Sequence, residues 1–381
     1  MAPRARASPD HTVTGKSFRF IDLFAGIGGL RQAFEARGVG GSCVFASESD
    51  RFAQQVYRAN FSRDTHPIVG DIREVEARDV PDHEVLVAGF PCQPFSLAGV
   101  SSRNSRGLVH GFFDEIQGTL FFEIARIVKV KRPSVLFLEN VPNLLSHDSG
   151  RTFNVMTDVL EGLDYRLVYE VVDARPWVPQ GRRRIVIIAF DARREKSRNQ
   201  KVSRAFSFAQ VKKPSKRPVM RGILHPNNGR DVCVGPSMTT SRDLRSAWYT
   251  DVRGRVNPKY TISPALWEYL QRYAEKHRAA GNGFGFGLVG PDDIARTMSA
   301  RYYKDGAEIL VDQGRRRPPR RLTPRECARL MGFPESFRIP ESDRQAYQQF
   351  GNSVVVPMMV AIARALTPSI IDLLHVSRRR A

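Results

Sequence analysis

Short runs of apolar residues alternate with longer, helix-like stretches over the first half of the chain. The runs have the length of buried strands, and a helical period returns between them. The predicted strands are Phe18–Leu23, Ser42–Ala46, Val85–Gly89, Ser134–Leu138, Tyr165–Val172 and Arg184–Phe190. The predicted helices are Leu30–Arg37, Phe52–Asn60, Leu120–Val130 and Thr152–Gly162. This alternation predicts an α/β domain with a mostly parallel sheet.

The pattern changes near Asp191. The stretch Arg193–Arg217 is rich in Lys, Arg and Ser, and from there to about Pro334 the chain is irregular and broken by Gly and Pro. Gln345–Leu374 is helical again, and we expect it to return to the first domain. The expected division is a disordered basic arm over 1–17, a first domain over 18–190 plus 345–381, and a smaller second domain over 191–344.

The charge balance narrows the choice of partner. The chain carries 59 Lys and Arg against 39 Asp and Glu, a formal net charge of +20, which favours a polyanionic partner such as nucleic acid. A basic protein of the membrane surface is the weaker alternative, because no lipidation signal or long basic amphipathic helix is visible. The apolar run Val354–Leu366 is too short to span a bilayer and contains Arg364.

The cysteines and the N-terminal residues indicate a compartment. Cys43, Cys92, Cys233 and Cys327 are far apart in the chain, without a Cys-x-x-Cys pair, which argues against a zinc site or a disulfide framework. Residues 1–17 lack the apolar core of a signal peptide. We therefore expect no metal site and a cytoplasmic protein.

A glycine turn near the start of the chain indicates a nucleoside site. Phe20–Leu30 predicts a strand, a turn with Gly26, Gly28 and Gly29, and then a helix. The next strand ends near Glu48, at the spacing where a carboxylate takes ribose hydroxyls. The turn is not Gly-x-Gly-x-x-Gly, so a nucleoside is favoured over a pyrophosphate, and a purely structural turn remains the alternative. Asp71-Ile72 could meet an adenine, although an aspartate there is more often a helix cap.

Three chemically active groups lie at the ends of predicted strands. Cys92 lies between Pro91 and Pro94, after an apolar strand. A lone cysteine at such a place is usually buried and inert. Here, however, Glu139 follows a second strand and Gln180–Arg184 opens a third. Because strand ends meet at one edge of an α/β sheet, a nucleophilic thiol, a carboxyl and arginines form a plausible site.

These residues carry a resemblance to the cytosine-5 DNA methyltransferase family. Seven short motifs occur in the family's order: Phe24–Gly29, Pro91–Gln93, Gly118–Phe122, Glu139–Val141, Gln180-x-Arg182-x-Arg184, Arg321–Glu326 and Gly351–Val354. The motifs are distributed over nearly the whole chain, apart from residues 1–17 and 191–300. Gly281–Gly287 and Thr297–Gly306 resemble the Dcm-like branch, whose typical target is CCWGG.

The resemblance implies a Rossmann-like fold and a reaction. The first domain would bind S-adenosyl-L-methionine, and the second would be an irregular target-recognition domain. The methyl group would pass to carbon 5 of a cytosine flipped out of double-stranded DNA. In the family mechanism the thiolate of Cys92 adds to C6, Glu139 gives a proton to N3, Arg184 binds the O2 edge and Arg182 helps position the site. A solvated basic face is the alternative for the arginines.

The resemblance also assigns binding residues. Phe24 would stack on the adenosyl group, Glu48 would bind the ribose, and Asp71 with Ile72 would meet the adenine; the pocket would be completed by Gly26, Gly28, Gly29, Pro91, Leu120, Asn352 and Ser353. Ser49 departs from the family, which often has a large apolar residue there, so adenine packing would be weaker.

DNA contacts are expected from two places. The loop Ser96–Gly111, which follows Gln93 and includes Arg103 and Arg106, would close over the flipped base, unless it is an ordinary surface loop. Arg320 and Arg321 end a run of arginines that would grip phosphates. Bases would be read from His225–Tyr260 and Gly281–Tyr303.

Three rival functions stay open at this stage: an RNA cytosine methyltransferase, a non-catalytic DNA-binding relative and a nucleotide-dependent oxidoreductase. The expected protein is a bacterial, nucleoid-associated monomer that acts alone or beside a restriction endonuclease.

Overall fold

The computed structural model describes residues 17–64, 66, 68–91, 120–196, 206–226, 230–231, 234–238, 248–282 and 285–377. Several predicted residues lie outside these ranges: the N-terminal arm, Cys92, Gln93, Ser96, Arg103 and Arg106. The glycine turn, the carboxyl and arginines at the strand ends, and most of the second half are described.

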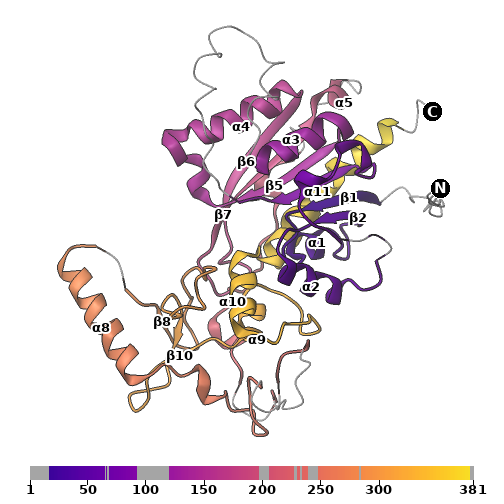
Figure 1. Cartoon of the computed structure of the whole chain (residues 1–381). Coiled ribbons are helices and arrows are strands. Elements are labelled where there is room, and N and C mark those ends of the chain that lie inside the picture. Colours follow the sequence, from indigo (N-terminus) through magenta and orange to yellow (C-terminus); the bar gives the residue numbers. More distant parts are fainter. Residues whose placement is uncertain are drawn as a thin grey trace.

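A seven-stranded sheet forms the centre of the first half (Figure 1). Its strands are β1 (Phe18–Leu23), β2 (Gly41–Ser47), β3 (Ile68–Val69), β4 (Val85–Gly89), β5 (Val135–Asn140), β6 (Tyr165–Asp173) and β7 (Arg183–Asp191). The order is β3-β2-β1-β4-β5-β7-β6, and β7 runs antiparallel to both of its neighbours. The six predicted strands are confirmed with small shifts at their ends, and the two-residue β3 was not predicted.

Helices cover both faces of this sheet. They are α1 (Gly29–Phe34), α2 (Arg51–Asn60), α3 (Leu120–Lys131), α4 (Arg151–Gly162), α5 (Ala192–Lys196) and, from the end of the chain, α11 (Val356–Ser377). Alternate strand residues face opposite sides. Phe20, Val87 and Phe137 join the core under α1 and α11, whereas Leu86 and Leu138 join the core under α3 and α4. The central strands β4, β5 and β7 are apolar on both faces because both faces are covered.

The stretch predicted to be helical at the end of the chain forms two helices, α10 (Asp343–Asn352) and α11, which are separated at residues 353–355. Of these, α11 packs against α1, while α10 packs against α9 (Pro324–Leu330). By length and composition Asp343–Leu374 could cross a membrane. In the structure Met358, Ile362 and Leu366 are fully buried in the core that α1 and α11 cover, so α11 packs as a core helix.

The lower part of Figure 1 contains a smaller sheet with the helices α8 (Pro264–Ala279), α9 and α10. The sheet is β10 (Arg320–Arg321), β9 (Leu310–Val311) and β8 (Leu288–Val289). The 16-residue α8 was not predicted from the sequence. Ser263 caps it and Pro264 is its first residue, but Leu270, at 4% exposure, is its one buried residue, so its apolar pattern is weak.

Candidate active site

A cavity of about 410 Å³ opens at the edge of the sheet where β1, β4 and β5 end. Its wall includes ten of the predicted site residues: Phe24, Gly26, Gly29, Glu48, Pro91, Leu120, Glu139, Arg184, Asn352 and Ser353. They come from sequence positions more than 300 residues apart, and the sheet edge brings them together. Gly28, Asp71, Ile72 and Arg182 are not part of this wall.

The glycine turn brings the chain close to the break between α10 and α11. Gly28 has φ +84°, and a Cβ there would collide with the ring of Phe61. A Cβ on Gly29 would lie 2.7 Å from Oγ of Ser353. Only glycine allows both this backbone conformation and this approach. The turn and Ser353 therefore form adjoining parts of one wall.

Glu48 holds the turn from the end of β2. Its carboxylate accepts hydrogen bonds from the backbone N–H of Gly26 and of Asp50, both at 2.8 Å. Burial raises the pKa of Glu48. Each carboxylate oxygen has more than one acceptor position, so the group can still accept hydroxyl hydrogens of a ligand in the cavity.

Asp71 and Ile72 have structural partners. Asp71 caps the short 3-10 helix η1 (Ile72–Glu74), because its carboxylate accepts from the N–H of Arg73, and it also forms an ion pair with the Arg73 guanidinium. Arg73 thereby lowers the pKa of Asp71. Ile72 is buried in the core under α3. The structure thus favours the capping interpretation of Asp71.

The carboxyl of Glu139 faces the guanidinium of Arg184 across the β5–β7 ladder. Nε of Arg184 lies 3.0 Å from Oε1 of Glu139, and both side chains are nearly buried. Burial raises the pKa of Glu139, while the positive charges of Arg184 and Arg182 oppose that rise. Such a carboxyl can hold a proton closer to neutral pH than an exposed one.

The segment that leads to Cys92 is tied to this pair. A Cβ on Gly89 would lie 3.5 Å from Oε2 of Glu139, so the end of β4 packs against the carboxyl. The amide of Asn140 donates to the carbonyl of Phe90 at 2.9 Å. Pro91 belongs to the cavity wall, and Cys92 is the next residue in the sequence. Sequence reasoning gave Asn140 no role, although its place after Glu139 was a usable signal.

Arg182 joins β7 to the second half of the molecule. Its guanidinium is buried and donates to the carbonyls of Met298 (2.7 Å), Gly351 (2.8 Å) and Ser353 (2.7 Å). Burial lowers its pKa to about 9, which leaves it charged at neutral pH. Arg182 is therefore a positioning residue, which orders the end of α10 and the residues after it.

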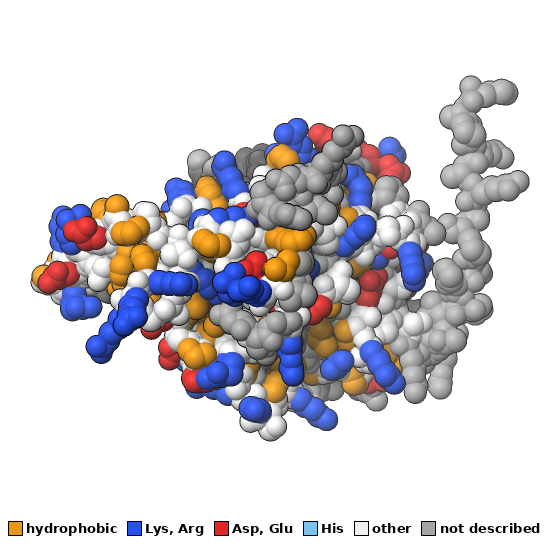
Figure 2. Space-filling view, turned by 90° about the horizontal axis from the view of Figure 1, so that it is seen from below, with side chains coloured by type: hydrophobic (Ala, Val, Ile, Leu, Met, Phe, Trp, Pro, Cys, Tyr) orange, Lys and Arg blue, Asp and Glu red, His pale blue; other side chains and the backbone are white. Residues whose placement is uncertain are grey.

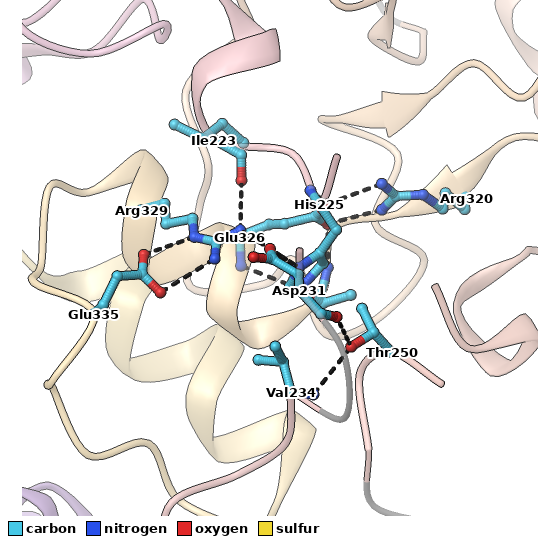
Figure 3. A network of polar contacts seen from close by, with 10 residues as sticks. Ile223, His225, Asp231, Val234, Thr250, Arg320, Glu326, Arg329 and Glu335 are labelled. Carbon is cyan, nitrogen blue, oxygen red and sulfur yellow. Dashed lines mark hydrogen bonds and ion pairs between the residues drawn. The ribbon is translucent and has the colours of Figure 1, made fainter. Parts of the chain in front are cut away.

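The prediction that Arg320 grips a phosphate is wrong. Arg320 is only 6% exposed, and its guanidinium makes two hydrogen bonds to the carboxylate of Glu326, at 2.7 and 2.8 Å (Figure 3). If Arg320 turned away from Glu326 to contact a phosphate, the buried carboxylate of Glu326 would be left without its counter-charge. Arg321 is half-buried, with its guanidinium over the ring of Tyr347.

His225 cannot read bases either, although the predicted reading region begins there. It is 3% exposed, and its ring nitrogens lie 2.7 Å from Asp231 and 2.9 Å from Oγ1 of Thr323 (Figure 3). Burial lowers the pKa of His225, which favours the neutral ring. The polar network in Figure 3 thus fastens the start of that region to α9.

Comparison with known proteins identifies the family. The model of the C-5 cytosine-specific DNA methylase family matches residues 18–367. The chain is 43% identical to a DNA-cytosine methyltransferase of Escherichia coli (strain K12), over 93% of this chain and 78% of that protein. It is 44% identical to the type II methyltransferase M.SsoII of Shigella sonnei, over 92% of this chain and 80% of that protein.

The fold agrees with solved structures. The S. pombe Dnmt2 methyltransferase superposes with a TM-score of 0.61 at 19% identity, over 93% of this chain and 99% of that one. This likeness confirms the Rossmann-like methyltransferase fold, and the curated relatives confirm a DNA-cytosine methyltransferase. The chain therefore belongs to the C-5 cytosine-specific DNA methylase family.

Proposed function

We propose that this enzyme methylates carbon 5 of a flipped-out cytosine through a covalent adduct between Cys92 and C6 of the base. The observation that carries the proposal is the buried Glu139–Arg184 pair at the cavity wall, directly beside the segment Gly89–Pro91 that precedes Cys92. A nucleophile, a proton donor and a cation then adjoin one base-sized space.

The residues take separate roles in this proposal. The Cys92 thiolate forms a bond to C6 while Glu139 gives a proton to N3, so that the ring carries no net negative charge. Arg184 binds the O2 edge and holds Glu139 in place. After C5 has accepted the methyl group, the C5 proton leaves to a base, and the C6–sulfur bond breaks to return the thiolate and the aromatic ring. Glu139 recovers its proton from N3.

The cavity suits S-adenosylmethionine as the cofactor. Phe24 can stack on an adenine, the Glu48 carboxylate can take ribose hydroxyls, and the open space at Gly26 admits a ligand close to the backbone. Leu120, Asn352 and Ser353 line the same cavity. When bound, the cofactor supplies the methyl group. Asn352 is exposed, whereas Ser353 is half-buried against Gly29, so Ser353 would fix the cofactor more tightly.

The recognition of DNA belongs to the second half of the chain in this proposal. Residues 191–344 form the target-recognition domain, Arg321 contributes a phosphate contact and CCWGG is the target. The similarity to a DNA-cytosine methyltransferase of E. coli supports the Dcm-like assignment. The names of type II methyltransferases among the relatives support a pairing with a restriction endonuclease. We propose a monomer in the bacterial cytoplasm.

Bisulfite sequencing tests the proposal. Unmethylated genomic DNA is incubated with the enzyme and S-adenosylmethionine, and 5-methylcytosine is mapped. We expect methylation at one short recurring sequence, CCWGG, and none with Cys92→Ala, which should still bind DNA. Methylation by Cys92→Ala would contradict the covalent mechanism, and a different recurring sequence would contradict the proposed target.

A further inference from the structure

A basic hollow lies beside the edge strand of the large sheet, outside the cavity described above. It has a volume of about 450 Å³ and is lined by Asp173, Arg175, Pro176, Lys213, Ser215 and Arg217, among others. We propose that this hollow binds a backbone phosphate of the DNA whose target cytosine enters the active-site cavity. The inference rests on the proposed function, because it concerns DNA bound at that site.

The charge of the hollow is strongly positive and largely unneutralised. Residues 212–217 read Lys-Lys-Pro-Ser-Lys-Arg, with four cations, no acid, and every side chain exposed. Asp173 forms an ion pair with Arg175 at 2.7 Å. Within the described part of the chain, Lys213 and Arg217 form no ion pair. An anion with several acceptor oxygens, such as a phosphate, could accept hydrogen bonds from Lys213 and Arg217 and neutralise their charge.

These cations lie on an anchored segment and not on a free arm. We call residues 206–222 the basic strap. Phe206 and Val211 before the cations, and Met220 after them, are buried in the core under α11. The N–H of Met220 donates to the carbonyl of Asp293 at 3.1 Å. Since the strap is already ordered on both sides, gripping a phosphate costs less conformational entropy than ordering a flexible loop.

The hollow lies at the same edge of the sheet as the active site. Asp173, the last residue of β6, pairs with Arg183, and the next residue of β7 is Arg184 of the active-site pair. Glu139 is level with Glu170 of β6 in the register of the sheet. Asp173 is therefore two strands across and three residues along from Glu139, roughly 14 Å at the usual strand spacings. Duplex DNA carries a charge about every 1.7 Å of its axis, so a duplex at the cavity presents several phosphates within this reach.

The face of the molecule drawn in Figure 2 suits a polyanionic partner. Figure 2 views the molecule from the end that carries the smaller sheet, and Lys and Arg side chains outnumber Asp and Glu side chains across that face. The hollow is a defined point of positive charge, since Lys213, Arg217 and Arg175 line one space.

The test measures how DNA binding depends on salt. The affinity of the full-length enzyme for a duplex with the target sequence, and for one without it, is measured over a series of NaCl concentrations. For Lys213→Ala/Arg217→Ala we expect the slope of log K against log salt to become shallower by about 0.9 on both duplexes, the value for one lost phosphate contact. Cofactor binding, and methylation at saturating DNA, should change less than about twofold, since phosphate contacts position the duplex.

Two matched variants control for charge alone. Arg37→Ala/Arg78→Ala removes two exposed cations, one in the turn before β2 at the opposite sheet edge and one in η2 (Ala77–Asp79). It should leave the slope unchanged. Lys213→Arg/Arg217→Lys keeps the charges and should keep the slope. The proposal would be overturned if Lys213→Ala/Arg217→Ala left the slope unchanged. It would also be overturned if Arg37→Ala/Arg78→Ala changed the slope by the same amount. Binding is read without turnover, so a wild type that binds DNA but methylates none would contradict the proposed function alone.

Discussion

The two halves of the molecule each bury an arginine–glutamate pair, and the two pairs have opposite properties. Glu139 faces Arg184 at the wall of an open cavity, and burial raises its pKa. Glu326 faces Arg320 in the sealed network of Figure 3, and its pKa is lowered to about 2. Burial raises the pKa of any carboxyl, so the difference must come from the donors around each one.

The donors explain the contrast. The Glu326 carboxylate accepts two hydrogen bonds from Arg320, one from the N–H of His225 at 2.9 Å and one from the N–H of Thr323 at 2.8 Å. Among the residues that the structure describes, Glu139 forms one ion pair, with Nε of Arg184. Glu326 is fixed as an anion that holds α9 in place, whereas Glu139 keeps acceptor positions open toward the cavity. The same pair of residue types thus serves structure in one region and chemistry in the other.

The largest expected effect is on turnover. Glu139→Gln removes the proton donor but keeps the size of the side chain, so kcat should fall by about 10²–10⁴-fold. Single-turnover methylation at saturating DNA and cofactor measures it, with circular dichroism to verify the fold. Glu326→Gln is the matched control, and its folded fraction should methylate at close to the wild-type rate. Similar losses in the two variants would break the contrast.

The second effect is on stability. Glu326→Gln leaves the buried charge of Arg320 without its counter-ion, and the free energy of unfolding should fall by about 3–5 kcal/mol. Urea denaturation of the two variants side by side measures this. Glu139→Gln should cost much less, because the Arg184 side chain is near the open cavity and can be reached by water. A larger loss in Glu139→Gln would contradict the account.

The smallest effect is a pH dependence of opposite sign. Glu326 has a lower pKa in the folded protein, about 2, than its ordinary 4.5. Its contribution to stability should therefore be present above pH 4.5 and be lost as the pH falls toward 2, by at most about 1.4 kcal/mol per pH unit. Glu139 has a raised pKa, so its contribution should decrease as the pH rises above 4.5. Urea denaturation from about pH 2 to neutral pH gives the free energy of unfolding of wild type and of each Gln variant. The difference between wild type and Glu326→Gln should rise with pH below 4.5, and the difference between wild type and Glu139→Gln should fall with pH above 4.5.

The sheet could be predicted closely from the sequence, because its strands are apolar on both faces and its helices alternate with them. The cavity wall followed from the same pattern, since strand ends meet at one edge. The helix α8 could not be predicted, because an exposed helix leaves little apolar period. Arg320 and Arg321 are neighbours in a run of arginines. Nothing in that run indicates that Arg320 forms a buried ion pair with Glu326.

The most direct test of the central claim is covalent trapping. A duplex that carries 5-fluorocytosine at the methylated position is incubated with the enzyme and S-adenosylmethionine, and the protein is analysed by intact mass spectrometry. Fluorine cannot leave C5 as a proton does, so the C6–sulfur bond should persist. We predict one covalent protein–DNA complex with wild type and none with Cys92→Ser. A complex that still forms with Cys92→Ser, or wild-type turnover without any complex, would contradict the proposed role of Cys92.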